Sequence, residues 1–222
     1  MKLHPKGVKL NMTTKPRLFE NGYYYHIYNR GIDKRRIFLC DRDYQRFLKT
    51  VKICNDKSTL RSFPLQENLP QKNKNHNVSV INYCFMPNHY HFTLKQLSDD
   101  GISHFLQRIG TSYTKYFNTK YKRSGRLFEY SYKSVSIESD DQLLHLSRYI
   151  HLNPVIGGLV KNPNQYSWSS YNSYFEENKN DLCNTSPILS NFSSSGSYQK
   201  FVLDQIEYAK KLKEIEKIII EK

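Results

Sequence analysis

The chain is organised around the sequence VSVINYCFMPNHYHFTL, which occupies residues 78–94. Two runs rich in apolar and β-branched residues flank Met-Pro-Asn at 86–88, a spacing that predicts two strands joined by a tight turn. Successive side chains of a strand point to opposite faces, so His89 and His91 should project side by side. Two imidazoles on one face can share a metal ion. Two partly exposed histidines without a ligand are the alternative when this pattern stands alone.

The sequence SRYIHLNPV at residues 147–155 adds a candidate nucleophile and a candidate third ligand to the pair of histidines. Ser139 is a typical N-cap residue, and Pro154 should end the helix that follows, because proline pushes the preceding residue out of helical geometry. Tyr149 and Asn153 are four residues apart, so they should share one face of this helix. A helix beside the sheet would offer Tyr149 as a nucleophile and Asn153 as an oxygen ligand. For Tyr149 alone, a half-buried aromatic with a hydrogen-bonded hydroxyl is the alternative.

Strands and helices alternate along the rest of the chain. Apolar and aromatic patterning predicts strands at 23–29 and 133–137, and helices at 41–55 and 102–120. The segment 57–77 is rich in Lys, Asn, Gln and Ser, which predicts a long excursion outside the packed elements. Strands and helices in this arrangement are typical of an α+β domain.

The 222-residue chain carries 34 lysine and arginine residues against 20 aspartate and glutamate residues, a formal net charge of +14. This excess is more than solubility needs and predicts a polyanionic partner, of which nucleic acid is the commonest. Basic and aromatic residues are interleaved between 108 and 133, as on surfaces that hold phosphates and stack unpaired bases, although a solvated helix face explains part of this pattern equally well. We predict that nucleic acid contacts Arg108, Lys115, Lys120, Lys122, Arg123, Arg126 and Lys133.

Composition also bears on the cellular setting. Residues 1–11 are basic and polar, without the apolar core of a signal peptide or a membrane-spanning helix. We therefore expect a cytoplasmic protein without membrane contact. The four cysteines are scattered and include no Cys-x-x-Cys pair, which predicts reduced thiols rather than disulfides or a zinc knuckle.

Several motifs follow one another in an order that is similar to one known family. They are HYH at 89–91, SGRLFE at 124–129, RYIHLNPV at 148–155 and YSWSS at 166–170. Together they resemble the single-tyrosine HUH transposases of the IS200-like superfamily, specifically the REP-associated branch. The resemblance covers about residues 23–171.

This resemblance implies the HUH endonuclease domain, a ferredoxin-like antiparallel β-sheet with packed helices, and the strand order rests on it. It implies that His89 and His91 bind a divalent metal, Mg²⁺ or Mn²⁺, and that Asn153 completes the metal site. It makes Tyr149 the nucleophile, which would join the 5′ side of a broken DNA strand as a phosphotyrosine. Tyr90 departs mildly from the aliphatic residue that the family motif prefers.

Four parts are predicted along the chain. They are a basic arm at 1–22, the transposase-like domain at 23–171, a linker at 172–197 rich in Ser and Asn, and an amphipathic helix at 198–222. The last helix would dock on the domain or pair with a second copy to form a homodimer.

The predicted function is metal-dependent cleavage and rejoining of single-stranded or hairpin DNA, that is, DNA transposition. A DNA- or RNA-binding regulator derived from such a transposase, without strand transfer, is the alternative. A nuclease of replication or conjugation is a third interpretation, which the lone tyrosine of the motif and the short chain disfavour.

Overall fold

The computed structural model describes residues 19–55, 77–129, 131–175, 182–209 and 211. The predicted arm before residue 19, nearly all of the 57–77 segment and the end of the predicted C-terminal helix lie outside these residues. No helix in the described part is long and apolar enough to cross a membrane.

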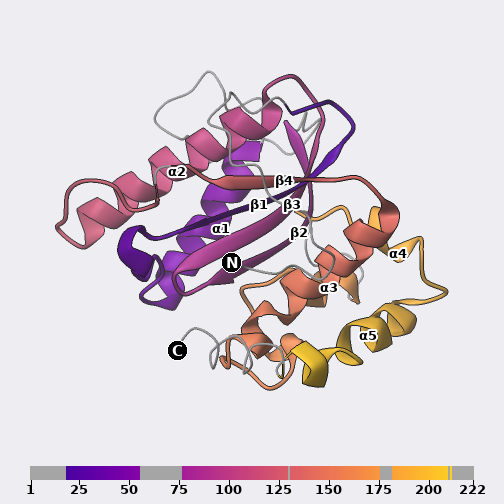
Figure 1. Ribbon diagram of the computed structural model, residues 1–222. Coiled ribbons are helices and arrows are strands. Elements are labelled where there is room, and N and C mark those ends of the chain that lie inside the picture. Colours follow the sequence, from indigo (N-terminus) through magenta and orange to yellow (C-terminus); the bar gives the residue numbers. More distant parts are fainter. Residues whose placement is uncertain (1–18, 56–76, 130, 176–181, 210, 212–222) are drawn as a thin grey trace, which may run out of the picture.

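A four-stranded sheet forms the centre of the structure (Figure 1). Its strands are β1 (Tyr24–Arg30), β2 (Val78–Met86), β3 (His89–Gln96) and β4 (Lys133–Ile137). They lie in the order β2-β3-β1-β4, and each neighbouring pair is antiparallel. This order, with helices between the strands, is that of the ferredoxin-like fold. The predicted α+β class is therefore confirmed.

The β2–β3 hairpin sets which side chains face each side of the sheet. The predicted tight hairpin is present, but Met86 belongs to β2 and pairs with His89, so the turn has two residues rather than the predicted three. Tyr90 and Phe92 then lie in the main buried cluster, together with residues of two helices. His91, between them in the sequence, projects to the other side of the sheet.

Helices cover both faces of the sheet (Figure 1). On one face, α1 (Asp41–Asn55) and α2 (Gly101–Lys120) pack against each other and close the main buried cluster. On the other face, α3 (Asp140–Ile156) lies chiefly against β2. The histidines of β3 therefore face the side of the sheet on which α3 lies.

Helix α3 begins as predicted and ends later than predicted. The Ser139 hydroxyl oxygen accepts a hydrogen bond from the backbone nitrogen of Gln142 at 3.2 Å and caps the first turn. Pro154 lies inside the helix, which continues to Ile156, so the predicted end at this proline is wrong. A proline in the last turn removes only one hydrogen-bond donor. The helix instead ends at a pair of glycines, where Gly158 has a φ of 73°.

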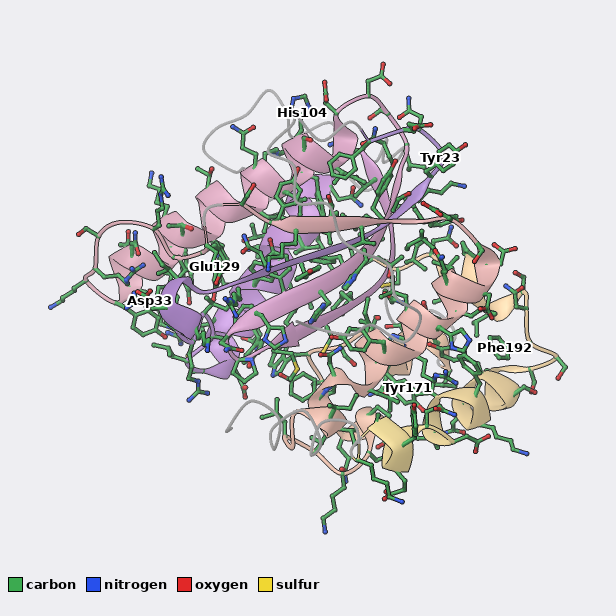
Figure 2. The ribbon with its side chains drawn as sticks, viewed as in Figure 1. Tyr23, Asp33, His104, Glu129, Tyr171 and Phe192 are labelled. Carbon is green, nitrogen blue, oxygen red and sulfur yellow. The ribbon has the colours of Figure 1, made fainter. Side chains whose placement is uncertain are left out.

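The predicted linker at 172–197 is packed structure in its described part, which corrects that prediction. It contains most of η4 (Tyr171–Tyr174), then α4 (Ser186–Leu189) and the start of α5 (Ser195–Leu203), which begins earlier than the predicted helix. A turn at 204–205 follows α5, and residues 206–209 are helical again. Figure 2 shows Tyr171 and Phe192 on the side of the molecule that α3 and α5 form. Few apolar side chains interrupt the Ser- and Asn-rich sequence, but two of them, Tyr174 and Ile188, join Tyr171, Tyr198 and Val202 in a second core with α3.

The YSWSS motif runs along the free edge of β2. The backbone nitrogen of Phe85 donates to the carbonyl of Trp168 at 2.9 Å, and that of Ser170 donates to the carbonyl of Tyr83 at 3.0 Å. The Trp168 ring stacks on Tyr44 of α1 with 4.8 Å between centroids. An edge strand covered in this way cannot pair with another chain.

A buried carboxylate joins the two helices of the first face. Asp43 on α1 accepts hydrogen bonds from Lys120 Nζ at 2.5 Å, the Tyr121 hydroxyl at 2.7 Å, the Tyr116 hydroxyl at 3.0 Å and the Leu39 backbone nitrogen at 2.8 Å. Burial acts to raise the pKa of this carboxyl, but the hydrogen bonds, led by that from Lys120, outweigh burial and hold the pKa below its ordinary value.

Asp43→Asn should therefore lower the free energy of unfolding at pH 7 by about 2 to 3 kcal/mol, because it removes the charge that Lys120 faces. Since the pKa of Asp43 is lowered in the folded state, its contribution is present above the ordinary carboxyl pKa of about 4 and is lost as the pH falls below it. Urea unfolding of both proteins at pH 7 and pH 3 measures this difference. Asp41→Asn, an exposed acid in the same helical turn, is the control and should cost less than about 1 kcal/mol.

Candidate active site

The predicted nucleophile and the predicted histidine pair lie close together. The ring centroids of His89 and His91 are 5.0 Å apart on β3, and the Tyr149 ring of α3 lies edge-on to His91 at 5.7 Å. The Tyr149 side chain is 47% exposed, whereas His91 is 5% exposed. An accessible phenol therefore stands beside a buried imidazole.

Each histidine of the pair has one ring nitrogen occupied by a polar neighbour. His89 Nδ1 lies 2.7 Å from Asn88 Oδ1, and His91 Nδ1 lies 3.0 Å from Nε2 of His26 on β1. Burial, followed by the nearby His26 and His89, lowers the pKa of His91 well below its ordinary value. His91 is therefore neutral at physiological pH, as a metal-binding imidazole must be.

Asn153 is buried one helical turn after Tyr149. Its Nδ2 donates a hydrogen bond to the backbone carbonyl of Tyr149 at 2.8 Å, which leaves Oδ1 as the acceptor atom of the amide. Among the described residues, no three His, Cys, Asp or Glu side chains form a group that could hold a metal ion. A metal site at the histidine pair would therefore need a further donor other than a described His, Cys, Asp or Glu side chain.

His26 and Tyr28 of β1 belong to the same surface, and the sequence motifs do not reveal them. The His26 ring lies edge to edge with the His91 ring, nearly parallel to it at 5.3 Å between centroids, and 6.3 Å from the Tyr149 ring. The Tyr28 ring lies 5.8 Å from His91, its cross-strand neighbour. Their two-residue spacing on a predicted strand was the available signal, but only the strand order brings them beside β3.

The seven basic residues predicted to contact nucleic acid have different environments. Arg108 donates to the carbonyl of Cys54, and Lys120 is held by Asp43, so both join α2 to α1. Arg123 donates to Asn118 Oδ1 in the last turn of α2 and to the carbonyl of Arg126 in its own loop. The exposed members are Lys115, Lys122, Arg126 and Lys133.

The loop at 121–129 lies at the same end of the sheet as His89. Its backbone contacts the end of β1, because Ile32 donates to Leu127 and Glu129 donates to Arg30. Figure 2 accordingly shows Asp33 and Glu129 at one end of the molecule. On β4, exposed Lys133 has its Nζ 5.8 Å from the centre of the Tyr28 ring. Part of the predicted basic surface therefore borders the histidine pair.

A buried histidine anchors the helix that carries Tyr149. His151 Nδ1 lies 2.7 Å from the hydroxyl of Tyr198 on α5, and its Nε2 lies 2.9 Å from the hydroxyl of Ser170. Burial lowers the pKa of His151 to about 3. One side chain thus joins α3 to α5 and to the segment along the β2 edge.

The ferredoxin-like sheet, the histidine pair and the facing tyrosine define a protein of the single-tyrosine HUH class. The model of the IS200-like transposase family matches residues 19–153. The chain belongs to this family. The predicted resemblance is therefore confirmed.

The solved structures that are similar to the chain include two transposases. A REP-associated tyrosine transposase bound to a REP hairpin aligns with a TM-score of 0.55 and 17% identity, over 77% of this chain and 90% of that chain. A candidate transposase from Deinococcus radiodurans R1 aligns with a TM-score of 0.37 and 12% identity, over 62% of this chain and 95% of that chain. No curated protein matches the chain significantly. The first likeness confirms the fold.

His151→Leu should lower the free energy of unfolding by about 2 kcal/mol, because it keeps the buried volume but removes two hydrogen bonds. Thermal or urea unfolding measures the loss. His145→Leu changes an exposed histidine of the same helix and should stay within about 0.5 kcal/mol of the native protein. Equal losses in the two variants would contradict the anchoring role of His151.

Proposed function

We propose that the protein cleaves and rejoins single-stranded DNA through a covalent bond to Tyr149, with a divalent cation as cofactor. The observation that carries this proposal is the exposed Tyr149 ring, 5.7 Å from the buried ring of His91. Membership of the IS200-like transposase family supports the same chemistry.

The donor atoms around the histidine pair fit a divalent cation. Metal-binding histidines generally use one ring nitrogen for the metal and the other for a hydrogen bond, and in both rings here Nδ1 has the polar neighbour. Nε2 of His89 and of His91 would thus hold the cation, with Oδ1 of Asn153 as a third ligand. Two imidazoles and an amide oxygen, completed by phosphate oxygens and water, suit Mn²⁺ or Mg²⁺. The bound cation would stabilise charge on the scissile phosphate.

In the proposed reaction, the Tyr149 hydroxyl oxygen bonds to the scissile phosphorus while the bond from phosphorus to the 3′ oxygen breaks. The phenol loses its proton and the leaving 3′ oxygen gains one. The products are a 5′-phosphotyrosine and a free 3′ hydroxyl. One phosphate ester replaces another, so the reverse reaction rejoins the strand without ATP.

We propose hairpin DNA as the substrate. The net charge of +14 favours a nucleic acid partner, and the similar REP-associated transposase is bound to a REP hairpin. Exposed Lys133, whose Nζ lies beside the Tyr28 ring, and exposed Lys122 and Arg126 of the 121–129 loop would contact phosphates, while aromatic rings such as Tyr28 would stack on unpaired bases.

Tyr149→Phe should abolish the covalent adduct, because it removes the attacking oxygen and leaves the ring in place. Incubation with end-labelled hairpin DNA from the flanks of the protein's own gene, followed by a denaturing gel, should show adduct formation at least about 10³-fold slower than in the native protein. Tyr23→Phe, which changes an exposed tyrosine outside the site, is the matched control and should leave adduct formation unchanged. Tight hairpin binding by the native protein without any adduct would favour the non-catalytic regulator instead.

EDTA should abolish adduct formation by the native protein but leave hairpin binding in place, and Mn²⁺ or Mg²⁺ should restore it. The reason is that binding depends on the basic surface, whereas cleavage needs charge stabilisation at the phosphate. The same gel, run beside a filter-binding assay, measures both. An adduct that forms equally well in EDTA would refute the metal requirement.

Lys133→Ala should weaken hairpin binding and reduce its salt dependence. If Lys133 neutralises one phosphate of a single strand, the slope of log affinity against log salt should become shallower by about 0.7. Fluorescence anisotropy across a salt series measures this slope. Lys200→Ala, an exposed lysine on α5, is the control, and an equal change in that variant would argue against a specific contact by Lys133.

A further inference from the structure

We infer that His26 is a positioning residue that sets the tautomer of His91, so that His91 presents Nε2 to the metal. This inference rests on the proposed metal-dependent function and assigns a role to a residue outside the family motifs. The contact that carries it joins His26 Nε2 and His91 Nδ1, which are 3.0 Å apart.

The pairing of β1 with β3 creates this contact. Tyr28 lies directly opposite His91 and His26 lies opposite Thr93, so His26 and His91 are diagonal neighbours on one face of the sheet. Their rings are nearly parallel, with 15° between planes and 5.3 Å between centroids. Since His91 is 5% exposed, this contact replaces hydration of its Nδ1 by bulk water.

A hydrogen bond between two neutral imidazoles needs one donor and one acceptor. If His26 donated, His91 Nδ1 would accept and Nε2 of His91 would carry the proton, which would prevent it from binding a metal. If His91 Nδ1 donates, His26 Nε2 accepts and His91 Nε2 has its lone pair available for the metal. Only the second arrangement is compatible with the proposed site, and it requires His26 to carry its own proton on Nδ1.

In the proposed site His89 is likewise protonated at Nδ1, but its partner is an amide rather than a histidine. Its Nδ1 lies 2.7 Å from Oδ1 of Asn88, and an amide oxygen can only accept a hydrogen bond. The Nδ2 atom of Asn88 donates to the carbonyl of Lys34 at 3.3 Å, which holds the amide in this orientation. An amide therefore orients one histidine of the pair, and a third histidine orients the other.

Two variants of His26 separate positioning from packing. His26→Phe keeps a flat ring but removes the acceptor, so Mn²⁺ affinity of the DNA-free protein should fall by about 10- to 100-fold. His26→Gln can offer Oε1 near the position of Nε2 and should restore most of that affinity. Titration with Mn²⁺, followed by electron paramagnetic resonance of the free ion, gives the dissociation constants without any cleavage assay.

The tautomer itself can be observed in the metal-free native protein. Long-range ¹H–¹⁵N correlation spectra of ¹⁵N-histidine-labelled protein should show His91 protonated at Nδ1, and His91→Gln identifies its signals by their loss. Protonation of His91 at Nε2 would overturn the inference. This measurement also keeps the inference testable if His26→Phe fails to fold.

The outcomes distinguish the inference from the function on which it rests. Native-like Mn²⁺ affinity in a folded His26→Phe protein would overturn the positioning role and leave the proposed function standing. Equal losses in the Phe and Gln variants would also overturn it, because the loss would then not depend on an acceptor. No Mn²⁺ binding by the native protein would overturn the metal-dependent function first.

Discussion

The alternation of side chains along β3 is the constraint on which the candidate site depends. The two-residue turn fixes the pairing of Met86 with His89, and every later side chain of β3 then has an assigned face. A slip of one residue would move both histidines into the main core and would expose Tyr90 and Phe92, which are now buried. The large apolar area that these two rings bury therefore also holds the histidines on the opposite face.

The candidate site also requires that α3 keep a fixed position over the face of the sheet that carries the histidines. Helix α3 is not held by the domain sheet alone, because its buried side chains also meet Tyr171, Tyr198 and other residues of the C-terminal segment. His151 adds directional contacts to Tyr198 and Ser170 within this core. The C-terminal segment therefore supports the position of Tyr149, although none of its described residues belongs to the group formed by Tyr149 and the three histidines of β1 and β3.

Features that depend on residues close in sequence were predictable. The hairpin, the Ser139 cap and the shared face of Tyr149 and Asn153 each follow from spacings of two to four residues. His26 was missed because its contact with His91 joins residues 65 apart and exists only for this strand order. The hydrogen bond that occupies Lys120 likewise spans 77 residues. The linker prediction failed because average composition hides a few well-spaced aromatic residues, and burial depends on those residues rather than on the average.

The side chains that position the candidate site are different from those that would bind DNA. The histidines and Asn153 are packed against backbone or other rings, whereas Lys122, Arg126 and Lys133 are exposed along one end and one edge of the sheet. Exposed lysines can change with little effect on packing, but a change at His91 or Asn153 alters a buried hydrogen-bonded group. The affinity for a nucleic acid backbone could therefore vary at the surface while the histidines and the tyrosine keep their geometry. The same separation explains how a chain of this family could lose strand transfer and still bind nucleic acid, since loss of the Tyr149 hydroxyl alone would leave the basic surface intact.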